Sequence, residues 1–247
     1  MSPTVDIRWI GQSGYAITHP DGSVCLIDAY LSDYAEEQLG VRRVVPPPIN
    51  PAQARVDVVV CTHWHEDHLD RPTCESIATA SPAARFVGPP SVVARLRFWG
   101  VAADRTVELE RGGSAEVGSF GLHATFARHE VAGWLSEDAI GVVTEVAGVR
   151  ISHSGDTEYD RRCLDARGHG PLDAAMLVVN GEGGNMNARE AALMAHELSP
   201  ALAIPCHYGM WSHDRAAAET FTDYCGRLGG PATSVMELGE TLSVDAR

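Results

Sequence analysis

Four side chains of types that bind metal ions are crowded into one short segment of this chain. His63, His65, Asp67 and His68 directly follow 56–61, an apolar run rich in β-branched residues. Two histidines at alternate positions of an extended segment project from the same side, so both can reach one ion. Asp67 and His68 start the next turn, where they can serve an adjacent ion. Because so many imidazoles and carboxylates at a strand end are held together most readily around a cation, this spacing predicts a metal site.

Three more side chains of the same types follow runs that we expect to be strands. These are His129, Asp156 and His207, and Asp156 lies in a Ser-Gly-Asp-Thr turn. Open α/β sheets present their ligand sites at the carboxyl ends of strands, so we expect these residues to complete two metal shells. His123 and Glu130 are alternatives to His129. A donor set of nitrogen and oxygen without thiolate suits Zn²⁺, Mn²⁺ or Fe²⁺.

The chain has two successive halves, and in each half we expect strands followed by helices that position these residues. We expect strands at 5–10, 14–18, 23–28, 56–61, 84–87, 122–127, 139–146, 149–153, 174–179 and 201–205, with two more near the C-terminal end. We expect helices at 71–79, 91–99, 188–198 and 214–228. This order predicts a mixed α/β fold in which two sheets pack together with helices outside.

Local signals add detail to this plan. Asn187 with Glu190 three residues later predicts a capping box at a helix start. The segment 111–114 has the composition of a hairpin turn between strands. The proline-rich stretch 29–55 is expected to be a long loop over one face, a common position for a substrate lid.

The composition excludes several classes of function. The 247 residues are 45% apolar and no linker divides them, so we expect one domain over 1–247. With 19 basic and 33 acidic residues the net charge is −14, which disfavours binding to nucleic acid or to an anionic membrane. All 19 basic residues are arginines, which excludes a Schiff-base lysine and a P-loop.

The remaining sequence features bear on the cellular compartment. No basic segment followed by an apolar stretch begins the sequence, and no apolar run approaches the roughly 20 residues that cross a bilayer. Six cysteines without C-x-x-C pairs are typical of buried thiols in a reduced compartment. Cys206 could be a soft ligand, but strand alternation places it in the core because it neighbours His207. We expect a cytoplasmic protein with a small-molecule substrate, and we leave homo-oligomer formation open.

These motifs together resemble the metallo-β-lactamase superfamily over essentially the whole chain. The resemblance is closest to its L-ascorbate-6-phosphate lactonase branch. It is carried by His63-x-His65-x-Asp67-His68, Trp9-Ile10-Gly11-x-Ser13-Gly14, His153-Ser154-Gly155-Asp156, Gly181-Glu182 and Ile204-Pro205-x-His207-x-x-x-Trp211-Ser212. The resemblance implies an αββα four-layer sandwich with a dinuclear site.

The resemblance also implies the distribution of ligands between two divalent ions, Mn²⁺ or Zn²⁺, with Fe²⁺ as a further option. Residues of one shell would be His63, His65 and His129. The second shell would be Asp67, His68 and His207, with Asp156 bridging the two ions. The lactonase branch points to Mn²⁺.

The expected chemistry is hydrolysis by a metal-bound hydroxide, because two ions lower the pKa of a shared water. The hydroxide would open a lactone of a sugar acid or sugar phosphate, with Asp67 orienting it and moving its proton. Alternatives are a phosphodiesterase acting on a small phosphoester and a metal-binding protein without catalytic activity.

Residues around the predicted site complete the sequence-based expectations. Asn180 and Glu182 belong to a glycine-rich loop that could bind substrate hydroxyls, and Tyr208 and Trp211 could line the pocket. Candidates for a substrate phosphate are three arginines, although an arginine is more often solvated: Arg128, Arg161 and Arg215.

Overall fold

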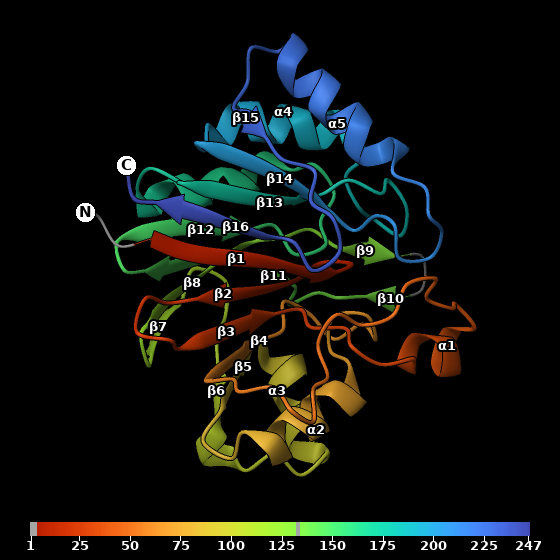
Figure 1. The fold of residues 1–247 in the computed structure, drawn as a ribbon, viewed down its shortest axis with the longest axis vertical. Coiled ribbons are helices and arrows are strands. Elements are labelled where there is room, and N and C mark those ends of the chain that lie inside the picture. The colour runs from red at the N-terminus through yellow and green to blue at the C-terminus, as the bar shows by residue number, and fades with distance from the viewer. Residues whose placement is uncertain (1–3, 132–133) are drawn as a thin grey trace.

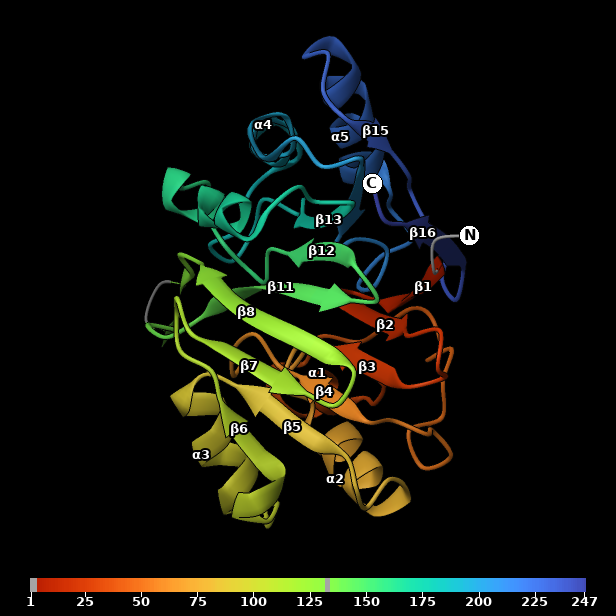
Figure 2. The same cartoon turned by 90° about the vertical axis from the view of Figure 1, so that its left-hand side faces the viewer.

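The computed structural model describes residues 4–131 and 134–247, and within them two seven-stranded β-sheets pack face to face between outer helices (Figure 1). The side chains at 130–131 and 134–135 lie outside this description. The turned view shows the same four layers, with helices above one sheet and below the other (Figure 2). The expected αββα sandwich is therefore confirmed.

The first sheet mixes an antiparallel and a parallel part. Its order is β16-β1-β2-β3-β4-β5-β6, antiparallel up to β3 and parallel from β3 to β6. Helices α2 (Arg71–Ala80) and α3 (Pro90–Phe98) cover its outer face (Figure 2). The strands are β1 (Thr4–Gly11), β2 (Gly14–Thr18), β3 (Val24–Ile27), β4 (Val58–Val60), β5 (Arg85–Gly88), β6 (Thr106–Glu108) and β16 (Thr241–Asp245).

The second sheet has the order β15-β14-β13-β12-β11-β8-β7, and its outer face carries α4 (Ala188–Leu198) and α5 (Ala216–Arg227) (Figure 1). A 3-10 helix, η2 (Arg161–His169), packs against β8 and β11. The strands are β7 (Ser114–Val117), β8 (Phe120–Phe126), β11 (Ile140–Val146), β12 (Val149–His153), β13 (Ala174–Val178), β14 (Leu202–Cys206) and β15 (Ala232–Thr233). Smaller elements are α1 (Tyr34–Leu39), η1 (Ala103–Arg105), β9 (Glu130–Val131) and β10 (Trp134–Leu135).

The sheets are held together by a continuous apolar core between their inner faces. Strands such as β4 and β13 are buried along their whole length, which matches their uninterrupted apolar sequences. Helix α4 buries one alanine- and methionine-rich face and begins with the expected capping box. Asn187 accepts hydrogen bonds from the N–H groups of Arg189 and Glu190, and the Glu190 carboxylate accepts from the N–H of Asn187 (2.9 Å).

Two local expectations need correction. The segment 111–114 does not close a hairpin, because β6 ends at the edge of the first sheet and β7 begins the edge of the second. It crosses between the layers, and the N–H of Gly112 donates to the carbonyl of Ala124 in β8 (2.9 Å). The stretch 29–55 is not irregular throughout, since it contains α1.

Other features agree with the sequence. All six cysteines are free, and Cys206 is fully buried in the core. Across residues 4–131 and 134–247, no helix is long and apolar enough to cross a membrane.

Candidate metal centre

Seven side chains converge where four strands end. The loop after β4 carries His63, His65, Asp67 and His68, and the segments after β8, β12 and β14 carry His129, Asp156 and His207. They form three overlapping groups whose ligand atoms lie within 4.8 Å of one another in each group. The structure thus brings together all seven residues of the ligand set that the sequence proposed.

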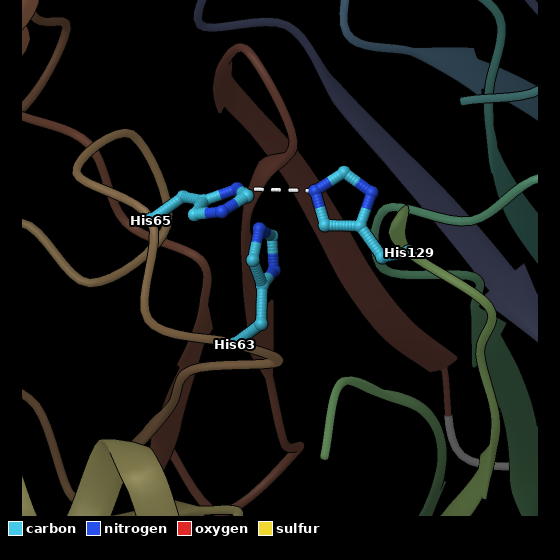
Figure 3. Close-up of side chains that lie close together, drawn as sticks. All are labelled: His63, His65 and His129. Atoms are coloured by element: carbon cyan, nitrogen blue, oxygen red, sulfur yellow. Dashed lines mark hydrogen bonds between the residues drawn. The ribbon is translucent and has the colours of Figure 1, made fainter. Parts of the chain in front are cut away.

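The first group consists of three imidazoles that point toward one another (Figure 3). Nε2 of His129 lies 3.0 Å from Nδ1 of His65, and the rings of His63 and His129 are 4.7 Å apart. Two nitrogen ligands about 2.05 Å from one ion at a tetrahedral angle are about 3.3 Å apart, so this spacing fits a shared cation.

One alternative to His129, the imidazole of His123, does not join this group. His123 hydrogen-bonds to Ser114 (2.8 Å) and stacks on His169 with ring centroids 4.5 Å apart, on another part of β8. The side chain of Glu130 lies outside the described residues. His129 can join the group because it follows the end of β8, where it reaches His65 in the loop after β4. His123 lies inside β8, away from that end.

Asp156 occupies the centre of the cluster. Its Oδ1 lies 3.3 Å from Nε2 of His68, and its Oδ2 lies 3.4 Å from Nε2 of His207 and 3.9 Å from Nε2 of His129. Asp67 approaches from the cavity side, with Oδ2 3.5 Å from Nε2 of His207. Asp156 therefore faces histidines of both expected shells.

The cluster contains buried polar atoms that lack partners. Among the described residues, Nε2 of His63, Nε2 of His68 and Oδ1 of Asp156 are buried without a hydrogen bond. Leaving such atoms unpaired costs about 1–3 kcal/mol each. Divalent cations bound at this cluster would be partners for all three atoms, so the donor set fits a metal site.

A fully buried carboxylate holds two of these histidines in orientation. Asp28, at the end of β3, accepts hydrogen bonds from the N–H and hydroxyl of Thr62, both 2.7 Å, and pairs with Nδ1 of His68 (2.8 Å). Because the hydroxyl of Thr62 donates to Asp28, Nδ1 of His63 must donate to that hydroxyl (3.1 Å). Both rings thus carry a proton on Nδ1 and turn Nε2 toward the centre, as metal-binding histidines do.

Two amides complete the polar surroundings. The amide of Gln12 donates to Oδ2 of Asp67 (2.7 Å) and lies 3.1 Å from Nε2 of His207, while the amide of Asn185 donates to Oδ2 of Asp156 (2.9 Å). Our sequence reasoning missed Gln12, Asn185 and Asp28. The available signals were weak: Gln12 is the unassigned position of the Trp9–Gly14 motif, and Asp28 ends a strand paired with β4.

The surroundings of the cluster raise the pKa of two of its histidines and lower the pKa of another. Burial lowers the pKa of His207, but the carboxylates of Asp156 and Asp67 outweigh it and raise this pKa to about 9. His68 follows the same pattern. Burial and the neighbouring His129 lower the pKa of His65 to about 4. Without a cation the cluster therefore stores protons on His68 and His207, and metal binding must displace them.

A cavity of about 390 Å³ opens over the cluster, the size of a small-molecule site. Asn180, Glu182 and Trp211 line it as proposed, and Leu39 and Val41 from the stretch 29–55 form part of its wall. Tyr208 does not line this cavity. Its hydroxyl donates to the carbonyl of Met236 (2.7 Å) and its ring stacks on Trp9 at 4.7 Å, because the residue after His207 turns back into the core.

The proposed phosphate-binding arginines lie elsewhere. Arg128 pairs with Glu158 (3.5 Å), Arg161 pairs with Glu197 (3.5 Å), and Arg215 pairs with Glu237. No arginine is found among the described residues that line the cavity.

Comparisons with known proteins agree with this architecture. An uncharacterised protein of Mycobacterium tuberculosis is 32% identical over 220 residues, which are 82% of this chain and 58% of that protein. The chain therefore spans less than two thirds of that relative. A UPF0173 metal-dependent hydrolase of Roseiflexus is 27% identical over 96% of both chains. The structure of Igni18, a metallo hydrolase from Ignicoccus hospitalis, superposes with a TM-score of 0.75 at 23% identity, covering 99% of this chain and 100% of Igni18. The family described as "Beta-lactamase superfamily domain" matches residues 24–208, and this chain belongs to that family.

Proposed function

We propose that this protein is a metal-dependent hydrolase that opens a lactone. The observation that carries the proposal is the convergence of unpartnered buried ligand atoms on His63, His68 and Asp156 beneath a cavity of small-molecule size. The similarity to a Roseiflexus protein named as a metal-dependent hydrolase supports the same reaction class.

The ligand groups support two divalent ions, Mn²⁺ or Zn²⁺. In this proposal His63, His65 and His129 hold one ion, Asp67, His68 and His207 hold the other, and Asp156 contacts both. When bound, such ions supply a nucleophilic water near neutral pH and stabilise negative charge on the substrate oxygen.

Asp67 is the residue placed to move a proton. Its side chain is 15% exposed and lines the cavity, and the amide of Gln12 fixes its orientation through a 2.7 Å hydrogen bond. The oxygen of water bonds to the lactone carbonyl carbon, and the ring C–O bond breaks. Asp67 takes the proton lost by that water and passes it to the leaving alkoxide, so lactone and water become a hydroxy acid. Asn180 and Glu182 in the cavity wall can hydrogen-bond to substrate hydroxyls.

The proposal is tested with metal-stripped protein reloaded with Mn²⁺ or Zn²⁺ and assayed on lactones and small phosphodiesters. We expect lactone opening that requires metal and falls about 10²- to 10⁴-fold in Asp67→Asn. Asp104→Asn, an exposed acid outside the cavity, is the matched control. Phosphodiester cleavage without lactone opening, or no turnover by fully metallated protein, would overturn the proposal.

A further inference from the structure

We infer that His153 is a positioning residue of the metal centre, which ties the turn that carries Asp156 to the turn that carries Gln12. The inference rests on the metal centre of the proposed function and does not depend on its substrate. His153 ends β12 in the second sheet, whereas residues 12–13 join β1 to β2 in the first sheet. Its imidazole therefore connects two segments of different sheets that both carry residues of the site.

Both ring nitrogens of His153 have a partner, and the side chain is fully buried. Nδ1 lies 2.9 Å from the backbone nitrogen of Gly155, and Nε2 lies 2.8 Å from the carbonyl oxygen of Ser13. A backbone N–H can only donate, so Nδ1 accepts and the ring proton lies on Nε2, which donates to Ser13. Burial lowers the pKa of His153, which favours this neutral ring. One tautomer thus satisfies both turns at once.

The turn at residues 12–13 orients two ligands proposed for the second ion. The amide of Gln12 donates to Oδ2 of Asp67 (2.7 Å), and the carbonyl of Gln12 accepts from the N–H of His207 (3.0 Å). Gln12 and His207 both have positive φ, 54° and 65°. Residues other than glycine keep this conformation only where surrounding contacts hold it. The hydrogen bond from His153 to Ser13 is such a contact, because it fixes the residue that follows Gln12.

The other turn carries the carboxylate between the two expected shells. Gly155, whose N–H donates to His153, directly precedes Asp156. Oδ2 of Asp156 lies 3.4 Å from Nε2 of His207, the histidine that the turn at residues 12–13 supports through its backbone. A shift of His153 relative to Ser13 would therefore change the spacing between Asp156 and His207.

A role in core packing alone is the alternative, since the His153 ring also meets the Tyr15 ring edge-on at 5.8 Å. Two replacements separate these roles. Asparagine places its amide oxygen near the position of Nδ1, so it can accept from Gly155 but is too short to reach Ser13. Glutamine carries its amide nitrogen to about the position of Nε2, so it can donate to Ser13.

The first test titrates metal-stripped protein with Co²⁺, whose visible absorption reports the geometry of its ligands. We expect the wild type to bind two ions. In His153→Asn one ion should bind about 10- to 100-fold more weakly and with a changed spectrum, and the other within about threefold of the wild type. His153→Gln should restore binding of the weakened ion to within about threefold of the wild type.

The matched control is Ser81→Ala. The Ser81 side chain is also buried, accepts from the N–H of Val56 (3.1 Å) and donates to the carbonyl of Ala54 (3.0 Å), away from the cluster. It should lower the temperature of thermal unfolding without changing the Co²⁺ titration or spectrum. His153→Asn combined with Gln12→Ala should weaken binding by less than the product of the two single effects, because both changes disturb the same turn.

A second measurement uses the unmodified protein and does not require any variant to fold. Proton–nitrogen NMR of the imidazoles should show His153 protonated on Nε2 alone, both without metal and with Zn²⁺ bound. A proton on Nδ1 in either state would overturn the inference, because Nδ1 could then not accept from Gly155.

The outcomes distinguish this inference from the proposed function. Wild-type Co²⁺ binding by folded His153→Asn, an equal loss in His153→Gln, or multiplicative effects with Gln12→Ala would each overturn the inference and leave the hydrolase intact. Fewer than two ions bound by the wild type would overturn the two-ion centre of the proposed function, and this inference with it. A metal-loaded protein that opens no lactone would overturn the proposed reaction alone.

Discussion

Replacement of Asp28 by asparagine should weaken metal binding, although Asp28 does not line the cavity. Its Oδ2 accepts from the Thr62 hydroxyl and from Nδ1 of His68, and its Oδ1 accepts from the Thr62 N–H. If the asparagine oxygen takes the Oδ1 position, its NH₂ group faces Nδ1 of His68. That nitrogen must then give up its proton and accept, which moves the proton of His68 to Nε2 and removes a metal-binding lone pair. The opposite amide orientation would set two buried donors against each other at Thr62.

The magnitude follows from the single interaction that is lost. A hydrogen bond to a charged group contributes about 1.5–3 kcal/mol, and removal of such support for a metal-binding histidine costs about 10- to 100-fold in affinity. These two figures agree, because tenfold corresponds to about 1.4 kcal/mol. We expect Asp28→Asn to bind Zn²⁺ or Mn²⁺ about 10- to 100-fold more weakly.

The assay is competition with a coloured chelator, and circular dichroism checks that the variant is folded. Asp173→Asn is the matched control, because Asp173 is also buried and accepts backbone N–H bonds from Arg150 (2.7 Å) and Arg247 (3.0 Å), away from the cluster. A folded Asp28→Asn protein that binds metal within about twofold of the wild type would refute the argument about the His68 tautomer. A similar loss in Asp173→Asn would attribute the effect to general destabilisation.

Three further outcomes are expected. Metal at about 100 times its Kd should stabilise metal-stripped protein by about 2.7 kcal/mol in thermal unfolding, and the gain should disappear in His63→Ala. Since the pKa of His207 is raised to about 9 and that of His68 well above its usual value without metal, binding at pH 7 should release about two protons, and apparent affinity should rise about 100-fold per pH unit until His207 titrates near pH 9. Calorimetry in buffers of different ionisation enthalpy measures this release, and its absence at pH 7 would contradict the assignment. Gly155→Ala should destabilise the fold more than Gly183→Ala in urea melts. Both have positive φ (59° and 62°), but a Cβ at Gly155 would lie 2.5 Å from the carbonyl of Ile140, whereas nothing lies within 4 Å at Gly183. Equal losses would show that φ strain alone matters.

Much of the fold could be predicted from the sequence because its signals are local. Strand alternation and buried apolar runs depend on neighbouring residues, so β2 and β12 lie where expected, and the capping box of α4 is complete within four residues. The loop after β4 carries His63, His65, Asp67 and His68 on consecutive turns, so their clustering also needed only local spacing.

The tertiary structure alone decided the contacts between distant segments. Sheet membership depends on long-range pairing, so the turn at 111–114 looked like a hairpin although it connects two sheets. His129 reaches His65 because the carboxyl ends of strands from both sheets meet at one edge, and His123 cannot because it lies inside β8. Tyr208 follows His207 in sequence but packs on Trp9.

Gln12 and Asp28, which hydrogen-bond to the metal ligands, also could not be predicted from the sequence. Nothing in the spacing of Gln12 or Asp28 links them to the histidines, since 55 residues separate Gln12 from Asp67 and 40 separate Asp28 from His68. The sequence by itself determined which side chains could bind a metal. The pairing of β3 with β4 decided which nitrogen of His63 and His68 faces the centre, because that choice depends on Asp28, a hydrogen-bond partner at the end of another strand.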